Sequence, residues 1–196
     1  GEYEKALVKA DSIYNYAKAQ NNRAGMGVIL HDISMIYTFQ RRYPEAEKCL
    51  RESIDMLQDQ TSYLGMLATV SYHLVTNLIA QERYDDALKA ACETEEVNRR
   101  FEAAAKSPQP SAWYNLWLGY IDLYRQMNEF DKEQLYINKV DSATKGSVKL
   151  YKERGHVLYG KKRYHEALEM LDKAIEQYPN KHEAKELKQM TLIQMD

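Results

Sequence analysis

The side chains most able to do chemistry in this chain are three histidines, His31, His73 and His156. His31 is followed by Asp32, and His31 and His73 each lie in a stretch of helical period, so two neighbouring helices could share a metal ion. A metal site needs further ligands, and no third ligand of suitable type stands out in the sequence. We therefore predict that these histidines are polar residues on a solvated face, and that the chain binds no metal and no cofactor.

The sequence lacks the common motifs of catalysis. It has no glycine-rich phosphate loop, no His-Glu-x-x-His pair, no serine-centred elbow and no Cys-x-x-Cys pair. We predict that the chain is not an enzyme. Cys49 and Cys92 occupy similar places in two related segments. A disulfide between them is one interpretation, and two small buried apolar residues are the other, which we favour.

Charge and hydropathy argue against two classes of partner. The 196 residues include 27 Lys and Arg and 29 Asp and Glu, a formal net charge of −2, whereas nucleic-acid-binding domains concentrate basic residues on one face. No stretch approaches the roughly 20 apolar residues of a membrane span. We expect no nucleic-acid binding and no membrane insertion by this segment.

An internal repeat indicates the architecture. A five-residue sequence motif, which begins with an aromatic residue and usually has a small residue at its fourth position, occurs five times. Successive copies are 40, 41, 46 and 34 residues apart. Such spacings are typical of solenoids built from helix pairs. The copies lie at 3–7, 43–47, 84–88, 130–134 and 164–168.

Each copy of the motif after the first follows an amphipathic stretch of helical period and a short polar break. The stretch is predicted to be the first helix of a hairpin and the break its turn, so the motif begins the second helix. Two antiparallel helices joined by so short a turn approach closely, and the residue at their contact must be small. The small residues at this place are Ala6, Ala46, Ala87 and Ala167. Glu133 takes the same place in the fourth copy. A carboxylate there is costly unless it reaches solvent or is paired, so we expect the hairpin around 114–144 to be splayed or displaced.

These patterns predict an all-α fold: an α-solenoid of antiparallel helix pairs with a C-terminal capping helix, formed by residues 1–196 as one domain. Pro108 and Pro110 cannot lie inside a helix, so a kink is expected at 107–111. The predicted elements are a lone second helix at 2–20, the pairs 23–40 with 43–58, 61–81 with 84–104, 111–127 with 130–143 and 147–160 with 164–177, and the cap at 181–194.

The repeats resemble the tetratricopeptide repeat family, and the resemblance implies a right-handed α-solenoid. Residues 148–181 match its pattern at Tyr151, Gly155, Leu158, Tyr164, Ala167, Leu171, Ala174 and Pro179. Residues 27–60 match at Leu30, Ile33, Ser34, Tyr37, Tyr43, Ala46 and Leu50, and the copies that start at 68 and 114 are looser. Arg154 departs from the pattern at the seventh position. The resemblance extends over nearly the whole chain and implies structural roles for Tyr43, Ala46, Tyr84, Ala87, Phe130, Tyr164, Ala167 and Pro179.

The resemblance also implies a partner-binding groove, because five positions of each first helix line the concave face in this family. The groove would be apolar and aromatic in its first half and charged in its second, and would suit a partner with an apolar and an acidic portion. Packing on neighbours is the alternative for these side chains. The implied residues are Val28, His31, Met35, Thr38, Phe39, Thr69, Tyr72, Thr76, Ile79, Ala80, Asn115, Leu118, Asp122, Arg125, Gln126, Lys149, Lys152, His156, Tyr159 and Gly160.

Two narrower interpretations follow from particular positions. Members of this family that bind the carboxyl terminus of chaperones have Lys, Asn and Arg at particular groove positions. This chain has other residue types at those positions, so we do not expect it to bind chaperone termini. These positions hold His31, Met35, Tyr72, Thr76, Leu118 and Asp122. On the helix predicted at 111–127, Trp117 and Tyr124 fall on structural positions and are expected in the core. Trp113, Tyr114 and Tyr120 remain candidate surface aromatics of an interface.

We therefore expect a non-catalytic module that holds a peptide or helix of a protein partner in the concave groove. The alternative is the extracytoplasmic input domain of a bacterial membrane sensor histidine kinase or a related two-component signalling regulator, whose repeats the runs 10–14 and 22–26 resemble. That alternative predicts a periplasmic location and an apolar span of about 20 residues after Asp196; the first hypothesis suits the cytoplasm. Because the chain begins with Gly1 and half a repeat, we expect a segment of a longer protein.

Overall fold

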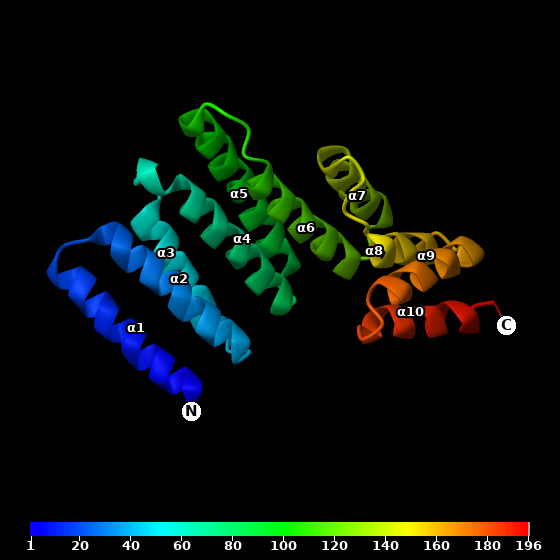
Figure 1. Cartoon of the computed structure of the whole chain (residues 1–196), viewed down its shortest axis with the longest axis horizontal. Coiled ribbons are helices and arrows are strands. Elements are labelled where there is room, and N and C mark those ends of the chain that lie inside the picture. Colours follow the sequence, from blue (N-terminus) through cyan, green and yellow to red (C-terminus); the bar gives the residue numbers. More distant parts are fainter. Residues whose placement is uncertain (196) are drawn as a thin grey trace. The chain divides into compact units, whose positions relative to one another are not determined.

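The computed structural model describes residues 1–195, which form ten α-helices, one short 3₁₀ helix and connecting turns, with no strand among these residues (Figure 1). The helices pack in adjacent pairs, which confirms the predicted all-α architecture. The chain forms two compact units, Gly1–Gly119 and Tyr120–Asp196. The single array over residues 1–196 therefore stays a prediction.

The first unit is built from two complete helix pairs, one further helix, a short 3₁₀ helix and the start of another helix. In it α2 pairs with α3 and α4 with α5, while α1 packs on α2 and α3 packs on α4 (Figure 1). The helix ends lie within one residue of the predicted positions, except that residues 61–63 form a 3₁₀ turn. The elements are α1 (Glu2–Ala19), α2 (Arg23–Phe39), α3 (Tyr43–Leu57), η1 (Thr61–Tyr63), α4 (Leu64–Ala80), α5 (Tyr84–Ala105) and the first part of α6 (Pro110–Gln126).

The second unit contains one further pair and the helices on either side of it. Here α8 pairs with α9, α7 packs on α8, and α10 packs on α9. α8 begins four residues later than predicted, because Lys145 and Gly146 have positive φ angles of +50° and +68° and residues 147–150 are irregular. The elements are the end of α6, α7 (Phe130–Thr144), α8 (Tyr151–Gly160), α9 (Tyr164–Gln177) and α10 (His182–Ile193).

The same short turn joins α2 to α3, α4 to α5, α6 to α7 and α8 to α9. Its middle residue has a left-handed backbone with φ between +57° and +60°. The next backbone N–H donates to the carbonyl five residues earlier, as from Arg42 to Tyr37 at 2.9 Å. This is the Schellman arrangement, which satisfies the last carbonyls of a helix, and here it forms without glycine. The left-handed residues are Arg41, Glu82, Asn128 and Lys162.

The second helix of three helix pairs has a completely buried alanine near its start. The side chains with no exposed surface are Ala46, Ala87 and Ala167. At Gly27 of α2, an added Cβ would lie 2.9 Å from Leu57 Cγ of α3, so the Leu57 side chain fills the space beside this glycine. The equivalent residue of α1, Ala6, is exposed.

The most apolar part of the chain is a core element. By length and composition alone, the segment Thr61–Ala80 could cross a membrane, so the expectation that no stretch approaches that length was wrong. More than half of the segment is buried inside the first unit, where α4 packs against α3 and α5. Buried core helices pass the same test, so this finding by itself does not indicate a membrane protein.

Candidate functional site

In the first unit, predicted groove residues of α2 and α4 share a cavity of about 190 Å³. Met35 and Thr38 come from α2, and Thr76 and Ala80 from α4. The cavity is smaller than the roughly 300–1,000 Å³ of ordinary ligand pockets. Its other lining residues are Tyr43, His73 and Asn77.

The remaining predicted residues of this unit do not line that cavity. Thr69 and Asn115 line a separate cavity of about 60 Å³. Ile79 is buried in the core and Phe39 is 67% exposed. The half-buried ones are Val28, Tyr72 and Leu118.

His31 and His73 stack where α2 meets α4. Their ring planes are 8° apart with centroids 5.0 Å apart, and Nε2 of His31 lies 2.7 Å from Nδ1 of His73. Burial lowers the pKa of both imidazoles, that of His73 to about 4. His31 is only 9% exposed, so it does not lie on a solvated face as predicted. Within residues 1–195, no three His, Cys, Asp or Glu side chains are grouped so that they could hold a metal ion.

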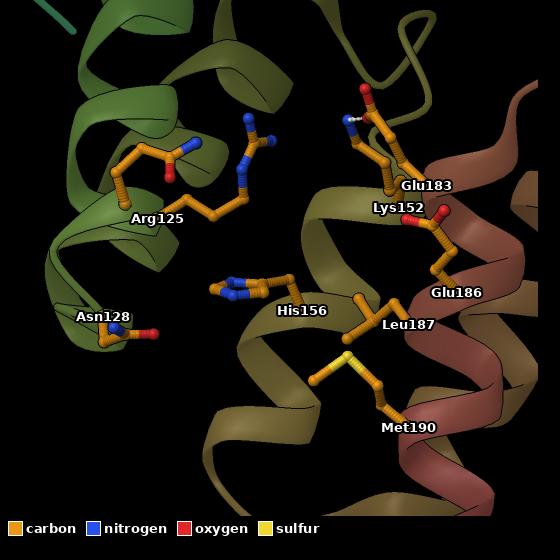
Figure 2. Close-up of a pocket in the computed structure, with 9 residues that line it drawn as sticks. Arg125, Asn128, Lys152, His156, Glu183, Glu186, Leu187 and Met190 are labelled. Atoms are coloured by element: carbon orange, nitrogen blue, oxygen red, sulfur yellow. Dashed lines mark hydrogen bonds and ion pairs between the residues drawn. The ribbon is translucent and has the colours of Figure 1, made fainter. Parts of the chain in front are cut away.

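A larger groove lies in the second unit, with a volume of about 490 Å³. Figure 2 shows its side chains projecting from α6 and the following turn, from α8 and from α10. Four predicted residues line it, namely Arg125, Gln126, Lys152 and His156. The other five were not predicted as groove residues: Asn128, Glu183, Glu186, Leu187 and Met190. The apolar residues three positions apart in α10 were the available signal, but that helix was interpreted only as a cap.

The cations of this groove are already paired with carboxylates of the chain. Lys152 Nζ lies 2.5 Å from Glu183 Oε2 (Figure 2) and 3.5 Å from Glu153. Arg125 forms ion pairs with Asp122 and, at 3.7 Å, with Glu153. The hydrogen bond from Lys152 lowers the pKa of Glu183. Asp122, a predicted groove residue, thus contacts Arg125 and is not among the residues that line the groove.

Three other predicted residues of this unit lie outside the groove. Lys149 is exposed and lines a small cavity of about 80 Å³. The Tyr159 ring packs beside Tyr164, with centroids 5.9 Å apart. Gly160 is covered by the ring of Phe130, which would collide with any Cβ there. Tyr159 and Gly160 therefore support the packing of α8 on α9 and on α7.

Glu133 is completely buried on α7. Its Oε2 lies 2.9 Å from Nδ1 of His156, while Oε1 is buried without a hydrogen-bond partner. Burial raises the pKa of Glu133, and the hydrogen bond and charge of His156 oppose this. A carboxylate at this position was expected either to reach solvent or to be paired. The structure shows the second: Glu133 is paired with His156.

The aromatic side chains of α6 pack mainly inward. Tyr120 is 2% exposed, and its ring stacks on Tyr136 of α7 with centroids 4.3 Å apart. The interpretation of Tyr120 as a surface aromatic was therefore wrong. Trp113 and Trp117 are half-buried with ring centroids 6.2 Å apart, and Tyr114 is also half-buried. Splaying of the hairpin around 114–144 stays a prediction.

The two cysteines form no disulfide. Cys49 is half-buried, and burial raises the pKa of its thiol to about 11. A thiol with so high a pKa is a poor nucleophile at neutral pH. Cys92 is exposed.

Comparison with known sequences agrees with the helix pairs. Two sequence models described as tetratricopeptide repeat match the chain, one over residues 28–58 and one over residues 148–181. The first match covers most of α2 and all of α3, and the second covers α8 and α9. A comparison with curated proteins found no match.

Proposed function

Because the chain is a tetratricopeptide repeat protein, we propose that it is a non-catalytic interaction module that holds a peptide or helix of another protein in the groove formed by α6, α8 and α10. Repeats of this family generally mediate protein–protein interactions. Solenoids of this type bind partners through extended surfaces formed by successive repeats.

The observation that carries the proposal is the size and lining of this groove. Its volume of about 490 Å³ exceeds that of the α2–α4 cavity and lies in the range of ligand sites. Leu187 and Met190 form an apolar strip along one wall, and Met190 is 50% exposed. Covering one such side chain with a partner contributes about 1.5–3 kcal/mol at most, so the apolar strip is the main source of affinity.

The charges of the groove favour one kind of partner. Arg125 and Lys152 are paired with carboxylates of the same chain, so an acidic partner would have to compete with these contacts. The exposed amides of Gln126 and Asn128 lie at the same groove and can both donate and accept hydrogen bonds. The best-fitting ligand is therefore a segment with a large apolar side chain flanked by neutral hydrogen-bonding groups. It differs from the expected partner in having no acidic portion.

The proposal can be tested with a displayed library of random peptides selected on the full chain. Met190→Asp places a charge on the apolar strip and should weaken the selected peptides about tenfold or more, equivalent to about 1.4 kcal/mol or more. Leu135→Asp is a matched control, because Leu135 of α7 is 52% exposed and does not line the groove. Binding is measured by calorimetry.

A library that yields no peptide whose affinity depends on Met190 would contradict the proposal. So would peptides that lose equal affinity for both variants, because the loss would then reflect surface charge rather than the groove.

A further inference from the structure

A carboxylate occupies the position of α7 at which α3, α5 and α9 have a completely buried alanine. Glu133 has no exposed surface, and the same holds for Ala46, Ala87 and Ala167. An ionised carboxylate buried without compensation is strongly unfavourable. The group that compensates for the burial of Glu133 therefore indicates the role of this carboxylate, which replaces the alanine of the other pairs.

Glu133 is connected to the groove through His156. Its Oε2 lies 2.9 Å from Nδ1 of the imidazole, whose side chain is 17% exposed. The ring of His156 projects into the groove between α6 and α10 (Figure 2). One ring nitrogen thus contacts a buried carboxylate, and Nε2, on the opposite edge of the ring, is left for a ligand in the groove.

The number of protons on this pair determines what Nε2 offers a ligand. With Glu133 ionised and His156 neutral, the hydrogen bond between them requires the proton on Nδ1, so Nε2 is bare and accepts. When the pair takes up one proton, Nε2 carries a hydrogen and donates. This holds for a carboxylate beside an imidazolium, and also for a carboxylic acid that donates from Oε2 to Nδ1 of a neutral ring.

We propose that Glu133 and His156 form a proton-dependent recognition point, at which uptake of one proton replaces a hydrogen-bond acceptor in the groove with a donor. Glu133 is a positioning residue that acts through His156, and His156 contacts the partner. The use of this point in recognition rests on the proposed function, whereas its proton chemistry belongs to the free protein.

Charged groups of three helices surround the pair. Arg125 of α6 stabilises the ionised form of Glu133, and Glu153 of α8 opposes it. Burial of Glu133 is the largest influence on its pKa and raises it, so the pair retains a proton to higher pH than an exposed carboxyl group would. The groove side of His156 adds Lys152, Glu183 and Glu186.

The test is ¹⁵N NMR of the His156 ring in the full chain, from about pH 5 to about pH 8, where imidazoles titrate. Glu133→Ala introduces the alanine of the other pairs and removes the acceptor. Glu133→Gln keeps an acceptor oxygen of similar size and removes the charge. The ring of His165, which is exposed on α9, serves as the internal control.

In the wild-type protein at high pH, the His156 proton is expected on Nδ1. The glutamine variant should keep this tautomer, because the amide oxygen still accepts the Nδ1 hydrogen. Without the carboxylate charge that couples to His156, its next proton should be taken up at a lower pH than by the wild-type pair. The alanine variant should lose the preference for Nδ1, with no change at His165.

A wild-type ring protonated on Nε2 at high pH would overturn the proposal, and this measurement needs no variant to fold. An alanine variant with the wild-type tautomer and titration midpoint would also overturn it. Because no partner is required, this experiment can fail or succeed independently of the peptide selection.

Discussion

The ring pair of His31 and His73 makes the first unit sensitive to acid. Burial is the main reason that both pKa values are lowered, and the neighbouring ring lowers that of His73 further, to about 4. An unfolded histidine titrates near about 6.5. Below that pH the unfolded chain binds protons that the folded pair excludes. This contribution to stability is therefore complete above about pH 6.5 and is lost as the pH falls toward 4.

We expect His73→Gln to reduce this loss, because glutamine can still hydrogen-bond to His31 but does not titrate. Between about pH 7.5 and about pH 5, the wild-type protein should lose on the order of 1 kcal/mol more unfolding free energy than the variant. Urea denaturation at both pH values measures the difference. His165→Gln, at an exposed position, should behave like wild type. Equal losses in wild type and His73→Gln would show that the ring pair does not control the acid response.

Contacts between individual side chains of different helices were the features of the site that the sequence predicted least well. The cost of a carboxylate in a crevice indicates that Glu133 needs a partner, but His156 is 23 residues away and becomes that partner only because α7 packs on α8. The positions of His31 and His73, which are 42 residues apart, could be predicted on neighbouring helices. Their burial could not, because it depends on the rotation of each helix about its axis.

The helix pairs could be predicted from local sequence signals alone. Apolar residues three and four positions apart, a polar break and an alanine after it all lie within one hairpin, so α2 and α3 end within one residue of the predicted positions. The start of α8 was predicted less well, because residues with positive φ before it shift the helix to Tyr151. The lining of the groove by α10 depends on the packing of a third helix beside a pair, which no hairpin pattern describes.

A bulky residue at the helix contact should destabilise a pair in proportion to burial. Ala46→Leu places three extra carbons where no surface is exposed, and should cost on the order of 1–3 kcal/mol of unfolding free energy. Ala6→Leu at the equivalent exposed position of α1 should change it by no more than about 0.5 kcal/mol. Both replacements are good helix formers, so helix propensity changes little.

Thermal and urea unfolding of the two variants give the comparison. If Ala6→Leu were as damaging as Ala46→Leu, tight contact between the paired helices would not be the reason for the alanine.

At the scale of the whole molecule, each of the two compact units has its own core. Leu78 of α4 is fully buried in the first unit, and Leu171 of α9 is fully buried in the second, where Ala174 and Ala184 surround it. Stability in a repeat protein is approximately a sum over repeats and their nearest-neighbour contacts. The interpretations as one continuous array and as the input domain of a sensor kinase stay predictions.

We expect Leu78→Ala and Leu171→Ala each to cost about 2–5 kcal/mol locally, with effects concentrated in the unit that carries the substitution. Amide hydrogen exchange followed by mass spectrometry measures this directly. Leu78→Ala should speed exchange in α3, α4 and α5, and Leu171→Ala in α8, α9 and α10. Uniform acceleration across residues 1–195 in either variant would indicate a single cooperative unit instead.

The left-handed turn residues bear on how the sequence of this protein can change. Arg41, Glu82 and Lys162 are exposed, and within residues 1–195 they form no structure-specific side-chain contact that the backbone needs. Glycine, asparagine and unbranched residues can therefore replace them at little cost, whereas proline and β-branched residues would be strained at a positive φ. Changing the number of residues is different. One inserted residue would rotate the following helix by about 100° about its axis, moving Ala46 or Ala87 out of its contact. The hairpin turns therefore tolerate substitution but strongly resist insertion and deletion.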